Sequence, residues 1–90
     1  MISYRFLFPA EEEMTDASIF YERAAPGLGS DFLDDVQHAI DMVRTQPLIG
    51  RDVGGGFRRT LLSKFPFSLI YFPASSEVVI VAVGSSTTAT

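Results

Sequence analysis

Acid–base chemistry in this 90-residue chain would depend on two side chains, His38 and Lys64. Cleavage of RNA, for example, needs a group that holds and releases a proton near neutral pH. Helical spacing turns His38, the single histidine, away from the apolar face of its segment, so we expect it on the solvated surface. Lys64 could act as a base if its pKa were lowered, with Arg58 or Arg59 stabilising phosphate charge. Because no second acid accompanies them, we predict no catalytic residue and favour a protein that is not an enzyme.

Arg58, Arg59 and Lys64 lie in one stretch, FRRTLLSKFPFSLIYF (residues 57–72). They are three of the seven basic residues in a chain whose net charge is −4. Two interpretations remain open. These cations could edge a sheet and resist strand-to-strand aggregation, or they could contact a macromolecular target. Direct nucleic-acid binding is not expected, because it depends on neutralising phosphates with Lys and Arg.

No cofactor and no metal site are expected. The chain has no cysteine, and the glycines at 50 and 54–56 are followed by no Gly-Lys-Ser/Thr, so a backbone turn is favoured over a phosphate loop. We interpret Glu11–Glu13 as a helix start. Three aspartates are predicted to form an exposed acidic face, with too few convergent ligands for a metal ion: Asp31, Asp34 and Asp35.

The elements that must position these residues follow from hydrophobic spacing and from the prolines and glycines. The expected strands are 2–8, 57–63, 67–72 and 77–83, the expected helices are 10–24 and 29–46, and 47–56 is expected to be a loop. Pro9 opens the first helix, Pro26-Gly27-Leu28-Gly29 separates the two, and Pro47 ends the second. Tyr71 is expected to be a packed aromatic whose hydroxyl reaches water.

The order strand–helix–helix–strand–strand–strand predicts an α+β fold, with a helical hairpin packed on one face of a mainly antiparallel sheet. Residues 1–84 are predicted to form a single domain and 85–90 a short flexible tail. The expected core residues of the first helix are Ala10, Met14, Ala17 and Tyr21. Those of the second helix are Phe32, Leu33, Val36, Ala39, Ile40 and Val43.

Composition and the amino terminus bound the class of protein. Hydrophobic residues reach 47% and charged residues 20%, which is typical of a folded domain. No run approaches the ~18 apolar residues of a membrane span, and MISYRFLFPA lacks the features of a signal peptide. We therefore expect a cytoplasmic protein with no membrane partner.

Apolar residues without an expected intramolecular partner indicate a protein-binding surface. Leu69–Phe72 and Val78–Val83 do not alternate with polar residues, so both faces of these strands need cover, whereas two helices can cover only one. The candidate partner-binding residues are Ile19, Phe20, Met42, Ile70 and Phe72.

Four stretches together resemble the RelE/ParE toxin superfamily of type II toxin–antitoxin systems, and more closely its ParE-like branch. They are PAEEEM, FYERAAPGLGSDFLDDV, QPLIGRDVGGGFRRTLLSKFPFSLIYF and VVIVAVG, and they extend over nearly the whole chain to about Gly84. The resemblance implies a toxin held inactive, in a hetero-oligomer, by a cognate ParD-like antitoxin. It also implies that the first strand lies beside the last.

The resemblance leaves the target open. ParE-like members poison DNA gyrase by protein–protein contact, and RelE-like members cut mRNA. After the last strand, members often continue with a His or Arg and an aromatic residue, whereas this chain reads GSSTTAT. This departure and the net acidity favour gyrase as the target, with Arg58, Arg59 and Lys64 as contact candidates. The alternatives are a RelE-like mRNA endonuclease and a degenerate copy that binds antitoxin without toxicity.

Overall fold

The computed structural model describes residues 1–86, which form two helices and a five-stranded sheet. In chain order these elements are β1 (Ser3–Phe6), α1 (Phe8–Ala24), α2 (Leu28–Thr45), β2 (Arg51–Gly54), β3 (Phe57–Leu61), β4 (Phe67–Pro73) and β5 (Glu77–Ser85). The predicted α+β fold is confirmed. One element was missed, because β2 lies inside the segment 47–56 that we expected to be a loop.

The sheet has the strand order β1-β5-β4-β3-β2. From β2 to β5 each strand runs antiparallel to the next, which gives a meander, and β1 pairs in parallel with β5. The first strand therefore lies beside the last, as the resemblance implied. The sheet is mixed, with a single parallel pair at one edge.

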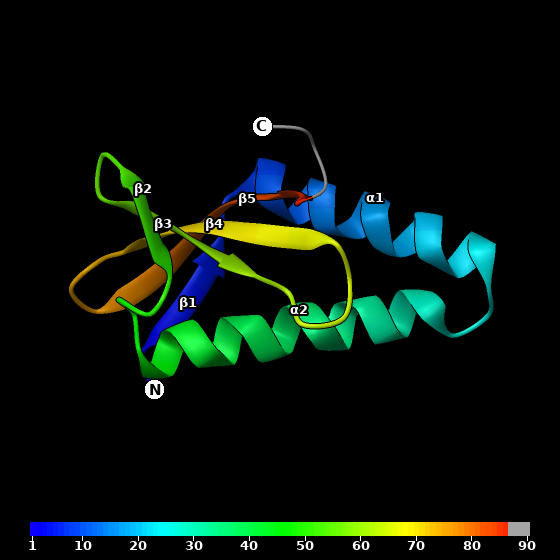
Figure 1. The fold of residues 1–90 in the computed structure, drawn as a ribbon, viewed down its shortest axis with the longest axis horizontal. Helices are drawn as coiled ribbons and strands as arrows, with labels where there is room; N and C mark the ends of the chain where they lie inside the picture. The colour runs from blue at the N-terminus through cyan, green and yellow to red at the C-terminus, as the bar shows by residue number, and fades with distance from the viewer. Residues whose placement is uncertain (87–90) are drawn as a thin grey trace.

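A glycine-containing turn joins the two helices into a closely packed hairpin. Gly27 adopts a left-handed φ of 87°, and the Glu22 carboxylate accepts hydrogen bonds from the backbone N–H groups of Gly27 (3.0 Å) and Gly29 (3.0 Å). A Cβ at Gly29 would lie only 2.5 Å from the Ser18 carbonyl oxygen, so the crossing depends on glycine. The hairpin projects past one end of the sheet, which leaves part of each helix without a strand beneath it (Figure 1).

The core lies between this hairpin and one face of the sheet. Leu69, Tyr71 and Ile80 are fully buried from the strands, and Phe32 and Val43 are fully buried from α2. Leu33 was wrongly predicted to belong to this core, since its side chain is 39% exposed. It lies one residue, or about 100° around the helix, from Phe32, so it falls on the flank of the apolar stripe.

Four aromatic rings fix the β3–β4 turn to the helical hairpin. The ring of Phe65 lies 4.8 Å from that of Tyr21, and the ring of Phe67 lies 5.0 Å from that of Phe32, measured between centroids. Both contacts are edge-to-face, an arrangement that stabilises aromatic pairs beyond their buried area. The Phe-Pro-Phe sequence thus places two rings on the core side of the same turn.

The carboxyl-terminal end of β5 extends into the predicted tail, 85–90. Ser85 ends the strand, and the Ser86 N–H donates to the Pro66 carbonyl oxygen at 2.8 Å. The rest of that tail, 87–90, lies outside the described residues. Within residues 1–86, neither helix is long and apolar enough to span a membrane.

Candidate functional site

The sheet has one face covered by the helices and one that is not. Successive side chains of a strand point to opposite faces, and paired residues share a face. Arg58 pairs with the buried Tyr71 and so shares the helix side, whereas Arg59 pairs with Ile70 on the other side. We call this other side the open face, defined by Arg5, Arg51, Phe57, Arg59, Leu61, Ile70, Phe72, Glu77 and Val79.

Apolar side chains occupy the middle of the open face. The rings of Phe57 and Phe72 pack edge-to-face with their centroids 5.4 Å apart, yet Phe72 remains 38% exposed. Leu61 is 60% exposed, and Ile70 is half-buried. Exposed apolar groups gathered on one face in this way are typical of surfaces at which proteins associate.

Arginines flank the apolar residues of the open face. Arg5 pairs with Glu77 at 3.2 Å. Arg51 and Arg59 lie opposite each other in the register of β2 and β3, and neither has an ion-pair partner within residues 1–86. The open face therefore combines apolar groups with unpaired positive charge, which favours an acidic and apolar ligand surface.

The structure does not bring the three predicted target-contact cations onto one surface. Arg59 lies on the open face. The Arg58 guanidinium lies on the helix side and donates from Nη1 to the carbonyl oxygens of Gly50 (2.8 Å) and Leu48 (3.3 Å), so it anchors the segment before β2. Lys64 lies exposed in the β3–β4 turn. Their role in target contact stays a prediction.

The five predicted partner-binding residues fall into three separate patches. Ile70 and Phe72 belong to the open face. Ile19 and Phe20 line a hollow of about 560 Å³ on the outer side of α1, where Phe20 is 68% exposed. Met42 belongs to the third patch and lines a second hollow, of about 250 Å³, at the carboxyl end of α2. A single partner that covers all five must therefore reach around the molecule.

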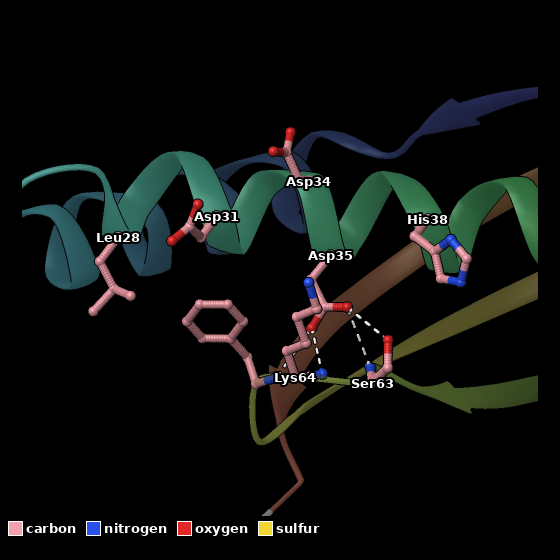
Figure 2. Close-up of a pocket in the computed structure, with 8 residues that line it drawn as sticks. Leu28, Asp31, Asp34, Asp35, His38, Ser63 and Lys64 are labelled. Carbon is pink, nitrogen blue, oxygen red and sulfur yellow. Dashed lines mark hydrogen bonds between the residues drawn. The ribbon is translucent and has the colours of Figure 1, made fainter.

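A larger pocket, of about 650 Å³, lies between α2 and the β3–β4 turn (Figure 2). Its lining combines apolar side chains with acidic, histidine and lysine side chains: Leu28, Asp31, Asp34, Asp35, His38, Ser63, Lys64 and Phe65. Asp35 was wrongly predicted to be part of an exposed acidic face. It is only 4% exposed, because its side chain points from α2 toward the turn.

Asp35 accepts four hydrogen bonds from the β3–β4 turn. Oδ1 accepts from the hydroxyl (2.9 Å) and the N–H (3.3 Å) of Ser63, and Oδ2 accepts from the N–H groups of Lys64 (2.8 Å) and Phe65 (3.0 Å). Burial alone would raise the pKa of Asp35, but the bonds from Lys64, Ser63 and Phe65 outweigh it and hold the pKa below its ordinary value. The carboxylate is thus ionised and fully engaged in fixing the turn.

Tyr71 is packed in the core as predicted, but the prediction that its hydroxyl reaches water is wrong. The hydroxyl donates to the Pro47 carbonyl oxygen (2.8 Å) and accepts from the Gly50 N–H (2.9 Å). Burial raises its pKa, although the Gly50 hydrogen bond and the charge of Arg58 oppose the rise. A Cβ at Gly50 would lie 2.5 Å from this hydroxyl, so the segment before β2 approaches Tyr71 as only glycine allows.

His38 lies exposed on α2, as its spacing predicted. It lines the same pocket as Asp31 and Lys64, about two helical turns along α2 from Asp31, and it belongs to a different side of the fold from the open-face arginines. Within residues 1–86, no three His, Asp or Glu side chains converge as metal ligands.

Sequence reasoning did not name several residues of these surfaces as site residues, among them Phe57 and Leu61 of the open face, Asp35 and Arg51. Asp35 lies three residues after Phe32 and four before Ala39, within the apolar stripe of α2, so helical spacing could have indicated its burial. Arg51 was missed because β2 was not predicted. Without that strand, the Arg51 side chain could not be assigned to either face of the sheet.

Comparison with solved structures finds the same fold in components of toxin–antitoxin systems. A chain of the chromosomal ParDE TA system from P. aeruginosa superposes with a TM-score of 0.80 at 17% identity, over 94% of this chain and 96% of that one. A chain of the toxin–antitoxin complex RelBE2 from Mycobacterium tuberculosis superposes with a TM-score of 0.65 at 18% identity, over 93% of this chain and 96% of that one. No protein-family profile and no curated protein matches the sequence. The predicted resemblance to the RelE/ParE superfamily is therefore confirmed at the level of the fold.

Proposed function

We propose that this protein is the toxin of a type II toxin–antitoxin system. In this proposal it is cytoplasmic and ParE-like, inhibits DNA gyrase by protein–protein contact, and is neutralised in a hetero-oligomer by a ParD-like antitoxin. The observation that carries the proposal is the fold, shared over nearly the full chain with components of the ParDE and RelBE2 systems. The open face is a second observation in favour of the proposal, since its exposed apolar side chains and unpaired arginines suit the binding of a partner protein.

The antitoxin segment that covers the open face is amphipathic and acidic. Its apolar side chains pack on Phe57, Leu61 and Phe72, and its carboxylates pair with Arg51 and Arg59. Charge pairs at the rim of such an interface fix register and speed association more than they add affinity.

In this proposal the same antitoxin chain contacts more than one side of the toxin. The hollow beside Ile19 and Phe20 lies on the outer side of α1, and the one beside Met42 lies at the end of α2. A segment that is disordered when free can wrap such separated sites by folding as it binds. Helices would fill the hollows on α1 and α2, while an extended stretch crosses the sheet.

The charges around Lys64 favour a protein target over a nucleic acid. Its ammonium lies at a pocket that is also lined by the carboxylates of Asp31 and Asp35. Successive phosphates of a nucleic acid bring a high density of negative charge, which those carboxylates repel. A protein surface can instead match one cation and several anions side by side.

A second candidate function is mRNA cleavage of the RelE-like kind. Arg51 and Arg59 beside the Phe57–Phe72 pair combine cations with aromatic rings, an arrangement that binds single-stranded nucleic acid. Within residues 1–86, however, the carboxylate on this face is Glu77, already paired with Arg5, and His38 lies on α2. The open face therefore has cations for phosphate but lacks a free group for proton transfer. A copy that binds antitoxin without toxicity is the third candidate.

The test is to incubate the purified protein with gyrase and relaxed DNA, and separately with mRNA on translating ribosomes. We expect inhibition of supercoiling that the antitoxin relieves, and no specific mRNA cut. Arg59→Ala should weaken inhibition, whereas Arg23→Ala, which removes the same charge from the outer side of α1, should not. Specific mRNA cleavage without any effect on gyrase would contradict the proposal.

A further inference from the structure

The β3–β4 turn is attached to α2 through one carboxylate. Three consecutive backbone N–H groups, those of Ser63, Lys64 and Phe65, converge on the two oxygens of Asp35. Successive N–H groups of this kind form a concave anion site, which here is filled by a side chain of the same protein (Figure 2). The turn is therefore held in one conformation by a group that lies on a different element.

The neighbours of Lys64 on both sides are also fixed. Leu62 is buried and its N–H donates to the Phe67 carbonyl oxygen at 2.9 Å, and the Phe65 ring packs on Tyr21. Between these anchors the Lys64 side chain is exposed and forms no ion pair within residues 1–86. The backbone of Lys64 is thus rigidly placed, while its ammonium is free for an external ligand.

We propose that Asp35 is a positioning residue for target contact: it holds the Ser63–Phe65 turn so that the Lys64 ammonium meets a carboxylate of the target protein at the mouth of the pocket. The inference rests on the proposed function, because it takes the target to be gyrase. Asp31 on the other wall accepts a basic group of the same surface. The pocket therefore complements a target surface that presents an acidic group next to a basic group, as protein surfaces do.

Asp35→Asn separates the roles of Asp35 and Lys64. An asparagine has one carbonyl oxygen, and its amide group would face N–H donors that now bond to the second carboxylate oxygen. The turn then loses its anchor, while the Lys64 side chain itself is unchanged. Asp34→Asn is the matched control, since it makes the same charge change on an exposed neighbour in the same helix whose side chain points away from the turn (Figure 2).

The test is a double-mutant cycle on the affinity of the purified protein for gyrase, with Asp35→Asn and Lys64→Ala. We expect each single variant to weaken binding about fivefold to tenfold, and the double variant to bind no more weakly than Lys64→Ala alone. A purely structural role of Asp35 would instead weaken binding by the same factor in both backgrounds. Asp34→Asn should change the affinity less than about twofold.

Hydrogen exchange of the free protein checks the turn without any target. In Asp35→Asn the amides of Lys64 and Phe65 should exchange faster, while those of the β4–β5 core stay protected. Should that variant unfold, Ser63→Ala replaces it, because it removes the 2.9 Å hydroxyl bond and keeps the carboxylate. Its smaller loss of affinity should likewise vanish in the Lys64→Ala background.

Each remaining outcome overturns a different claim. Equal factors in the two backgrounds, or no effect of Lys64→Ala, overturn the positioning role and leave the proposed function standing. A wild-type protein that does not bind gyrase overturns the proposed target, and the role of Asp35 with it.

Discussion

Asp35 and Tyr71 each use a buried polar group to hold an irregular segment in place. The Asp35 carboxylate fixes the turn between β3 and β4, and the Tyr71 hydroxyl fixes the segment between α2 and β2. In both cases backbone groups of a loop find their hydrogen-bond partners in a side chain of a regular element. Such partners decide whether the loop keeps its conformation, because a buried backbone group left unpaired is costly.

Loss of the Asp35 carboxylate should make the free energy of unfolding less dependent on pH in the acid range. Since its folded-state pKa is lowered, the carboxylate stabilises the protein above the ordinary Asp pKa of about 4, and this contribution is lost as pH falls through the lower folded-state value. At pH 7, Asp35→Asn should reduce the free energy of unfolding by about 2–3 kcal/mol. Urea titrations at several pH values should show the two proteins converging below pH ~4; a constant difference would contradict the assignment.

Removal of the Tyr71 hydroxyl should loosen the segment before β2. Tyr71→Phe leaves the Gly50 N–H and the Pro47 carbonyl without their bonds, at a cost of about 1–2 kcal/mol in the free energy of unfolding. Tyr4→Phe is the control, because the Tyr4 hydroxyl makes only an exposed 3.4 Å contact with Gln37; its effect should stay below about 0.5 kcal/mol. Thermal unfolding that gives the same shift for both variants would show that the Tyr71 hydroxyl is not an anchor.

The burial or exposure of a residue could be predicted where helical or strand spacing determines it. The apolar stripes of both helices and the exposure of His38 could be read from spacing, because a helix places residues three and four apart on one face. The burial of Asp35 was missed because its type outweighed its place within the stripe. The separation of Arg58 from Arg59 follows from strand alternation, which assigns neighbours to opposite faces.

The helices and strands whose own sequence shows a pattern of apolar residues were predicted, whereas β2, which shows no such pattern, was missed. Both helices have apolar residues at helical spacing, β4 and β5 have runs of apolar residues, and β1 and β3 each have at least two aromatic, apolar or β-branched residues. The sequence Arg-Asp-Val-Gly of β2 has no such run and is exposed throughout, so its strand conformation depends on pairing with β3. Pairing between segments is a tertiary interaction that local propensity does not contain.

Gly29 is the position where the helical hairpin is most sensitive. Alanine would normally stabilise a helix interior by about 1 kcal/mol, but here its Cβ would lie 2.5 Å from the Ser18 carbonyl oxygen. We expect the clash to prevail, so that Gly29→Ala lowers the free energy of unfolding by about 1–2 kcal/mol. Gly84→Ala is the control, since nothing lies within 4 Å of its added Cβ. A stabilised Gly29→Ala protein would show that the crossing is looser than described.

At the scale of the whole molecule, the protein has two different sides: an acidic side formed by the helices, and the open face, which neither helix covers. The acidic residues Glu11, Glu12, Asp16, Asp31, Asp34 and Asp41 all lie on the helices, whereas the open face has Arg51 and Arg59 unpaired. Although the net charge of the chain is −4, the open face is therefore locally basic. Under the proposed function, we expect this charge distribution to repel an acidic antitoxin segment from the helical side and to guide it to the open face.

Leu61→Ser should separate binding from folding. Leu61 is 60% exposed on the open face, and Leu48 is 67% exposed outside it, so both substitutions should leave the free energy of unfolding within about 0.5 kcal/mol of wild type. Leu61→Ser should weaken antitoxin binding about tenfold or more, and Leu48→Ser less than about twofold. Calorimetric titration measures both; equal effects would mean that the antitoxin does not use the open face.

The measurement that tests the central claim most directly is bacterial growth after induction of this chain alone and together with the protein encoded beside it. A gyrase-directed toxin should stop growth and induce the DNA damage response when expressed alone, and the neighbouring protein should restore growth. Unimpaired growth without the neighbour, at confirmed expression of the folded chain, would contradict the account.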